Sequence, residues 1–226
     1  MSSLIDAAAR ITDLAAGQAG LITTAQAAGV DVSRLELSRL VEKGLLERVA
    51  HGVYAFRVSS DVNKNIRAEW LALEPGMTAR ERRRNPEKGV ASHTTATIIH
   101  DLGDFLEGPP EFTLPTRRQS RRKVRIHRGV VSPADVSYID GILVTTVART
   151  IADLVRDGHD LEHVSRVVRE ALHEGSAAGA DIADQLDPLA AEHAHANGRE
   201  FTQFLMEVAG MDAATHPVSP SGAHHG

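Results

Sequence analysis

The chain has 226 residues, of which 42% are hydrophobic and 24% are charged, a mixture typical of globular proteins with a packed core. Cysteine is absent, which excludes a disulfide framework, a thiol nucleophile and every zinc site built on thiolates. The formal net charge is −5, but a protein of this charge can still hold DNA where its basic groups cluster on one face.

The charge is distributed unevenly along the chain. Residues 1–60 contain six basic and six acidic residues, residues 61–130 contain fourteen and nine, and residues 131–226 contain five and fifteen. We therefore expect nucleic-acid contacts in the first two thirds and none in the acidic third. No apolar run approaches the roughly 20 residues that cross a bilayer, and the N-terminus lacks signal-peptide features. These observations favour a cytoplasmic protein.

The first 60 residues have the pattern of a helix-turn-helix followed by a hairpin. Apolar residues at helical spacing predict a helix that ends near Gly17. Next come a short helix in TTAQAAG, a turn, and a helix in which Leu37, Leu40 and Val41 face inward. LLERVAHGVYAF then predicts two short strands around a turn at His51. This order is typical of a winged helix-turn-helix, in which the second helix of the motif enters the major groove.

The remainder predicts a second, mixed α/β domain. We expect a linking helix over 61–74 and a polar linker before residue 89. Helices are expected from Ser92 to His100, from Val147 to Val155, over 160–174 and over 188–209, with a shorter helix between the last two. EFTLP, VRIHRGVV and GILVTT are the expected strands. The predicted class is therefore α+β, divided into 1–60 (winged helix-turn-helix), 61–88 (linking helix and basic linker), 89–210 (α/β domain) and 211–226 (disordered tail).

Candidate DNA contacts lie on the third helix, the start of the second helix and the hairpin. Hydroxyl and cationic side chains suit phosphate and base-edge contacts. The candidates are Thr23, Thr24, Arg34, Ser38, Arg39, Lys43, Arg48, His51 and Arg57. Glu36 and Glu42 share the outward face and would repel phosphate. The alternative is a small helical bundle that binds another protein or packs on the second domain.

Three phrases together resemble the AbiEi-type antitoxins of the abortive-infection, or type IV, toxin–antitoxin systems. They are GLITTAQAAGVDVSRLELSRLVEKGLLERVAHGVYAF, ASHTTATIIHDLGD and GILVTTVARTIADLV. The resemblance implies a winged-helix domain that represses its own operon. It also implies a C-terminal domain that neutralises a nucleotidyltransferase-like toxin encoded alongside.

Catalytic and metal chemistry has little support in the sequence. None of Lys43, Lys64, Lys88 and Lys123 follows an acidic residue by two places, so the nuclease triplet that pairs metal ligands with a lysine is missing. Phosphate-binding loops and Gly-x-Ser-x-Gly elbows are also absent. His93, His100, Asp101 and Asp104 are better explained by capping and packing, and His193 and His195 by solvated surface. We expect no enzyme activity, no required metal and no cofactor.

A second basic cluster lies in the expected α/β domain. It comprises Arg117, Arg118, Arg121, Arg122 and Lys123 and continues to Arg125 and Arg128. The cluster could meet nucleic acid or an anionic partner, or be a solvated loop; Arg82, Arg83 and Arg84 allow the same alternatives. The favoured function is a DNA-binding antitoxin with operator DNA and a toxin as partners. The alternatives are a regulator whose second domain senses a ligand, and a nucleic-acid enzyme with an atypical site.

Overall fold

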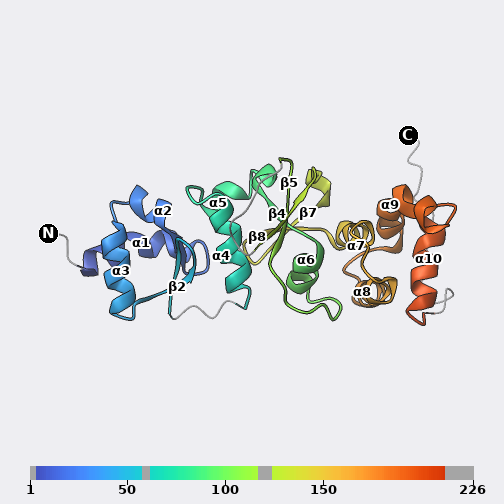
Figure 1. Ribbon diagram of the computed structural model, residues 1–226, viewed down its shortest axis with the longest axis horizontal. Helices are drawn as coiled ribbons and strands as arrows, with labels where there is room; N and C mark the ends of the chain where they lie inside the picture. The colour runs from blue at the N-terminus through green and yellow to red at the C-terminus, as the bar shows by residue number, and fades with distance from the viewer. Residues whose placement is uncertain (1–3, 58–61, 117–123, 212–226) are drawn as a thin grey trace. The chain divides into compact units, whose positions relative to one another are not determined.

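The computed structural model describes residues 4–57, 62–116 and 124–211 (Figure 1). The chain divides into two compact units, each formed from segments that are separate in sequence. The first comprises Met1–Ala91, Phe112–Pro133 and Tyr138–Leu143, and the second comprises Ser92–Glu111, Ala134–Ser137 and Val144–Gly226. The predicted α+β class is confirmed, with a helix-turn-helix-like region at the N-terminus and a sheet with helices after it.

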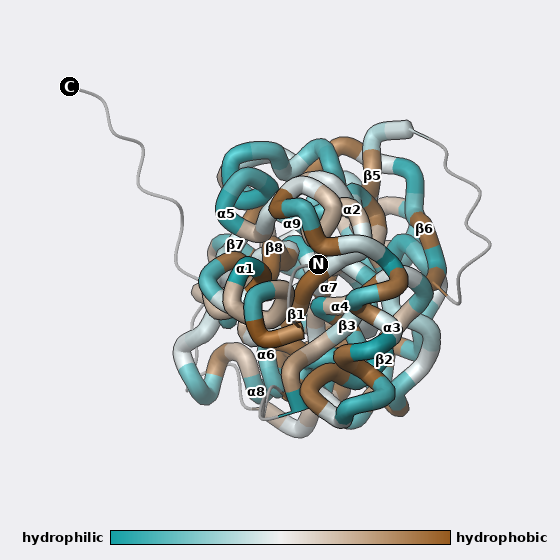
Figure 2. The backbone as a smooth tube through the Cα atoms, turned by 90° about the vertical axis from the view of Figure 1, so that its left-hand side faces the viewer, coloured by the Kyte–Doolittle hydropathy of each residue, from teal (hydrophilic) through white to brown (hydrophobic). Residues whose placement is uncertain are grey.

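The N-terminal part of the first unit contains three helices and a three-stranded sheet. The strand order is β1-β3-β2, and both pairings are antiparallel. The tube of this part carries both hydrophobic and hydrophilic residues (Figure 2), and the buried residues, Ala7, Ile11 and Ala15 of α1 and Leu37 and Leu40 of α3, lie at helical spacing, so each helix has one face for the core. The elements are α1 (Leu4–Ala16), β1 (Leu21–Thr23), α2 (Thr24–Gly29), α3 (Arg34–Glu42), β2 (Leu46–Ala50) and β3 (Val53–Phe56).

One hydrophobic cluster joins these helices to the hairpin. Its fully buried members include Ile11 of α1, Leu37 and Leu40 of α3, and Leu46 of β2. The side chains that the sequence places inward on α3 therefore lie in the core. Strand β1 has only three residues, all buried, and pairs with β3 in the register Leu21↔Ala55. Sequence periodicity does not predict a strand of this length.

Helix α4 (Lys64–Leu73) packs against the three-stranded sheet. The stretch expected as a linker after it contains α5 (Ala79–Arg82) and a 3₁₀ turn, η1 (Pro86–Lys88). Arg82 is fully buried, lies 4.0 Å above the Trp70 ring and donates to the carbonyl oxygen of Lys88 at 2.9 Å. Such stacking and hydrogen bonding allow a guanidinium to be buried. Arg82 is therefore an interior residue and not part of a solvated basic run.

A second sheet has five strands in the order β6-β5-β4-β8-β7. Strands β4 and β5 pair antiparallel, with Val90 opposite Thr113. The expected strands in EFTLP, VRIHRGVV and GILVTT are β5, β6 and β8, whereas β4 and β7 were not anticipated. The bounds are β4 (Val90–Ala91), β5 (Glu111–Leu114), β6 (Arg125–Arg128), β7 (Val136–Ile139) and β8 (Ile142–Thr145).

The second unit is mainly helical and encloses its own core. Helix α10 packs against α8 and α9, and α7 packs against α6, α8 and α9. Ile151, Val167, Leu186 and Phe201 are among the side chains fully buried between them. The helices are α6 (His93–His100), α7 (Val147–Arg156), α8 (Leu161–Glu174), α9 (Gly179–Ala190) and α10 (Gly198–Val208), with 3₁₀ turns η2 (Pro133–Asp135) and η3 (Ala191–His193).

Two expectations for the C-terminal helices are wrong. The single helix expected over 188–209 is interrupted between α9 and α10, where Ala194 has a positive φ of 63°. His193 and His195 are not a solvated pair, because both rings stack on Phe201, with centroids 4.9 and 4.8 Å away. Most of the expected tail, from residue 212 onward, lies outside the described residues. Within the described part of the chain, no helix has the length and apolar character needed to cross a membrane.

Candidate nucleic-acid interface

The helix-turn-helix-like region contains α2 and α3, each of which begins with a capping box. The Ser33 hydroxyl accepts a hydrogen bond from the backbone N–H of Glu36, whose carboxylate accepts one from the backbone N–H of Ser33. Thr23 and Gln26 cap α2 in the same way. The Thr23 hydroxyl is fully buried and also donates to the carbonyl oxygen of Pro75. It is therefore used within the fold and does not offer the phosphate contact that the sequence suggested.

Helix α3 exposes the polar side chains that the sequence places outward. Arg34, Ser38, Arg39 and Lys43 are all exposed, on the side away from the buried leucines of the core. The guanidinium groups of Arg34 and Arg39 make no hydrogen bond or ion pair with another described residue. Their guanidinium groups can therefore bind an outside acceptor without first breaking a contact in this part of the chain.

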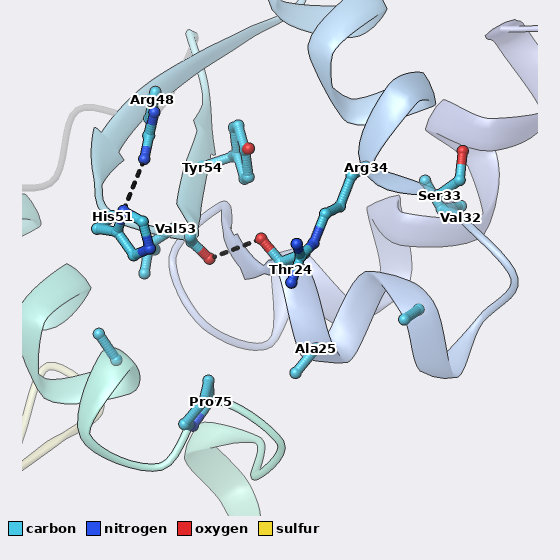
Figure 3. Close-up of a pocket in the computed structure, with 13 residues that line it drawn as sticks. Thr24, Ala25, Val32, Ser33, Arg34, Arg48, His51, Val53, Tyr54 and Pro75 are labelled. Atoms are coloured by element: carbon cyan, nitrogen blue, oxygen red, sulfur yellow. Dashed lines mark hydrogen bonds between the residues drawn. The ribbon is translucent and has the colours of Figure 1, made fainter.

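A pocket of about 510 Å³ lies between α3, α2, the hairpin and the end of α4. Arg34 extends from α3 toward Thr24, while Arg48 and His51 approach from the hairpin (Figure 3). Thr24 is half-buried, and its hydroxyl donates to the carbonyl oxygen of Gly52 at 3.3 Å, which ties α2 to the hairpin turn. Four of the predicted contact residues therefore line one pocket, which offers cationic and hydroxyl groups to an anion. The full lining is Thr24, Ala25, Ala28, Val32, Ser33, Arg34, Arg48, His51, Gly52, Val53, Tyr54, Ala72 and Pro75.

Arg48 and His51 are held together at the turn of the hairpin. The Arg48 guanidinium donates to Nδ1 of His51 at 3.0 Å. Because a guanidinium has only donors, Nδ1 is the acceptor nitrogen, and a neutral His51 ring has its proton on Nε2. Arg57 is exposed just after β3. The hairpin thus presents N–H donors from three side chains, which suits phosphate oxygens.

Two acidic residues near these cations are paired, whereas Glu42 is exposed on α3. Glu36 lies 3.6 Å from the Arg10 guanidinium, measured between Oε1 and Nη2. Hydrogen bonds from Ser33, with smaller contributions from Arg10 and Arg39, lower the pKa of Glu36. Glu47 accepts from Lys64 at 2.8 Å, and this contact lowers its pKa. Glu36, which the sequence suggested would repel phosphate, is therefore a capping group whose charge is offset by an arginine.

Comparison with known families identifies this region. Residues 9–57 match the family described as "Transcriptional regulator, AbiEi antitoxin". Residues 9–57, called the AbiEi-type segment below, are therefore similar to this family. The matched segment contains α2, α3, the three-stranded sheet and most of α1, and the family is one of regulators rather than enzymes.

A solved structure is similar in fold to most of this chain and not only to residues 9–57. The chain is similar to the RV2827C protein from Mycobacterium tuberculosis, with a TM-score of 0.51 and 15% sequence identity. The similarity covers 95% of this chain and 83% of that one, and at this identity it concerns the fold alone. No curated protein sequence matches the chain.

Other basic and titratable residues lie outside the AbiEi-type segment. The cluster of Arg117, Arg118, Arg121, Arg122 and Lys123 lies outside the described residues, so its role stays a prediction. Arg125 and Arg128, which follow it, are exposed on β6. Arg83 is also exposed and lies 4.4 Å from the centre of the Tyr138 ring.

The histidines and acids around α6 have structural partners. His100 Nε2 donates to the carbonyl oxygen of Thr145 at 2.7 Å, and burial lowers the pKa of this histidine. The Ser92 hydroxyl lies 2.9 Å from Nδ1 of His93 and does not cap the helix. Asp101 ends α6 in the left-handed conformation, and Asp104 pairs with Arg166. His100 and Asp104 thus have partners within the fold and Asp101 ends the helix, whereas the cap expected from Ser92 is absent.

The sequence did not single out Leu35. This side chain lies on α3 between the predicted contacts and is 60% exposed. The helical period that places Leu37 and Leu40 inward already places Leu35 outward, but an apolar side chain was not counted among the candidate contacts.

Proposed function

We propose that the chain is a sequence-specific DNA-binding antitoxin whose α3 enters the major groove as the recognition helix of a winged helix-turn-helix. The hairpin β2–β3 would be the wing, and its cations would contact flanking phosphates. The observation that supports this most directly is the set of exposed α3 arginines beside a cationic pocket, with the neighbouring Glu36 and Glu47 paired within the fold. The AbiEi match to residues 9–57 supports a regulator of this class.

We further propose that the chain represses its own operon by occluding the operator and counteracts a nucleotidyltransferase-like toxin. Residues 1–60 would bind DNA, 61–88 connect, and 89–210 act against the toxin, directly or indirectly. This functional division differs from the compact units, because Phe112–Pro133 and Tyr138–Leu143 cluster with the N-terminal residues. The AbiEi-like phrases in the second half of the sequence support the antitoxin role, and action on an operator would place the protein in the cytoplasm.

The test of DNA binding uses the fragment upstream of the chain's own gene. We expect Arg34→Ala and Arg39→Ala each to weaken binding by about 1–3 kcal/mol if the side chain contacts a base. If it contacts a phosphate instead, the variant would lower the slope of log affinity against log salt by about one. Fluorescence anisotropy over a salt series measures both quantities.

The matched control is Arg169→Ala, which removes an exposed arginine from α8. We expect this variant to bind the fragment as the unmodified protein does. Unchanged affinity and salt slope in both α3 variants would overturn the assignment of the recognition helix.

The runner-up function is a regulator whose second domain senses a ligand. An antitoxin gene should lie directly beside a gene for a nucleotidyltransferase-like protein. Its absence from the neighbourhood would favour the ligand-sensing alternative while leaving DNA binding in place.

A further inference from the structure

The outward face of α3 has a central row and two edges. With 3.6 residues per turn, residues three, four and seven positions apart lie on one side of a helix. Leu35, Ser38, Arg39 and Glu42 therefore form one row, and all four are exposed. The row lies opposite the core leucines of this helix, so it is the part of α3 that would point toward the floor of a groove.

Leu35 is the one apolar side chain among the exposed residues of α3, a helix that the structure describes in full. Its side chain is 60% exposed, so burial of its apolar surface against a partner would stabilise the complex. Its neighbours at the edge and in the row, Arg34 and Arg39, are cationic and match the charge of a nucleic-acid backbone. An apolar group between two arginines suits a groove that has an apolar feature on its floor.

The major groove of DNA has one such feature, the C5-methyl group of thymine. We propose that Leu35 determines specificity by contacting the methyl group of a thymine in the operator. The inference rests on the proposed function, because it requires α3 to lie in the major groove. It adds a preference for thymine at the base pair that faces the N-terminal half of α3.

The experiment removes the methyl group from the DNA. Duplexes that the full-length protein selects from a random library serve as probes, and each thymine is replaced singly by deoxyuridine, which keeps its pairing and its O4 acceptor. At one or more positions we expect the Kd to rise about fourfold, the change that corresponds to about 0.8 kcal/mol for one buried methyl-sized group. In Leu35→Ala the same replacement should change the Kd by less than about 1.5-fold, because the partner of the methyl group is gone.

Leu45→Ala is the matched control. Leu45 is 48% exposed and lies beyond the end of α3, after Gly44, so this variant should keep the full dependence on the methyl group. Because Leu35 is mostly exposed and alanine favours helix, Leu35→Ala should keep its unfolding midpoint. A lowered midpoint would show that Leu35 supports the fold and would overturn the proposed role.

The outcomes separate this inference from the function on which it rests. Selected duplexes that bind tightly and tolerate deoxyuridine at every thymine would overturn the role of Leu35 alone. Equal sensitivity in the unmodified protein and in Leu35→Ala would do the same. A library that yields no bound duplex would overturn the proposed DNA binding itself, and the role of Leu35 with it.

Discussion

His100 is a half-buried histidine whose hydrogen bond joins the end of α6 to the end of β8. Burial disfavours the charged imidazolium, so its pKa in the folded protein lies below the ordinary value of 6.5. The carbonyl oxygen of Thr145 accepts from Nε2 and opposes this shift, but desolvation is the larger effect. The folded state therefore binds a proton at His100 less readily than the unfolded chain does.

This difference predicts a pH dependence of stability with a defined sign. Between the pKa of His100 in the unfolded chain, near 6.5, and its lower pKa in the folded protein, the unfolded chain binds more protons. The contribution of His100 to the free energy of unfolding is therefore present above pH 6.5 and is lost as the pH falls. The loss reaches at most about 1.4 kcal/mol for each pH unit inside that window.

His100→Gln keeps an N–H donor but does not titrate, so its urea midpoint should fall less between pH 7.5 and pH 5.5 than that of the unmodified protein. His173→Gln, at an exposed position on α8, should behave as the unmodified protein, and parallel curves for all three would contradict the prediction.

Glu36 illustrates what the sequence can and cannot predict about a single residue. The pattern Ser-x-x-Glu before an apolar run is a capping signature, and the period of α3 places Glu36 near the boundary of the core. The approach of Arg10 from α1 depends on tertiary packing, which no local pattern encodes. The sequence was interpreted as placing Glu36 on the outward face, where it would repel phosphate, whereas in the structure it is a half-buried capping group beside Arg10.

At the scale of elements, the order helix, short helix, turn, helix, hairpin was predictable because each boundary has a strong local signal. Gly44 ends α3, and Gly52 forms the hairpin turn, both with a positive φ. The short strands β1 and β4, of three and two residues, were not predictable, because two or three residues show no alternation. The break between α9 and α10 had one usable signal, Asn197, whose side chain accepts from the backbone N–H of Glu200.

The crossing of α9 and α10 depends on a glycine. A Cβ on Gly198 would lie 1.9 Å from the carbonyl oxygen of Ala183 and 2.6 Å from the backbone nitrogen of Asp187. These are backbone atoms, so the helices must move apart. Gly198→Ala should lower the free energy of unfolding by about 1–3 kcal/mol or more, measured by urea denaturation. Gly108→Ala, where a Cβ meets nothing within 4 Å, is the control, and equal midpoints for the two variants would exclude this close approach.

At the scale of the whole molecule, the proposed DNA-binding role and the proposed role against a toxin fall on segments of different net charge. The AbiEi match ends at Arg57, and residues 131–226 contain fifteen acidic and five basic residues. Such a segment repels phosphate, so it is suited to contacts with proteins and not with DNA. Charge counts and the family match indicate this division, whereas the segments that make up each compact unit depend on the pairing of strands distant in sequence.

A division of roles predicts that repression and neutralisation can be lost separately. Arg39→Ala removes an exposed α3 cation and leaves the second unit intact, so it should derepress a reporter joined to the chain's own upstream fragment. If the proposed toxin is encoded beside this chain, the same variant, expressed from an independent promoter, should still rescue cells that express that toxin. Arg169→Ala, which removes an exposed arginine from α8, is the control and should repress the reporter as the unmodified protein does. Loss of rescue by Arg39→Ala at equal protein levels would show that neutralisation needs DNA binding, and the two roles would then not be separable.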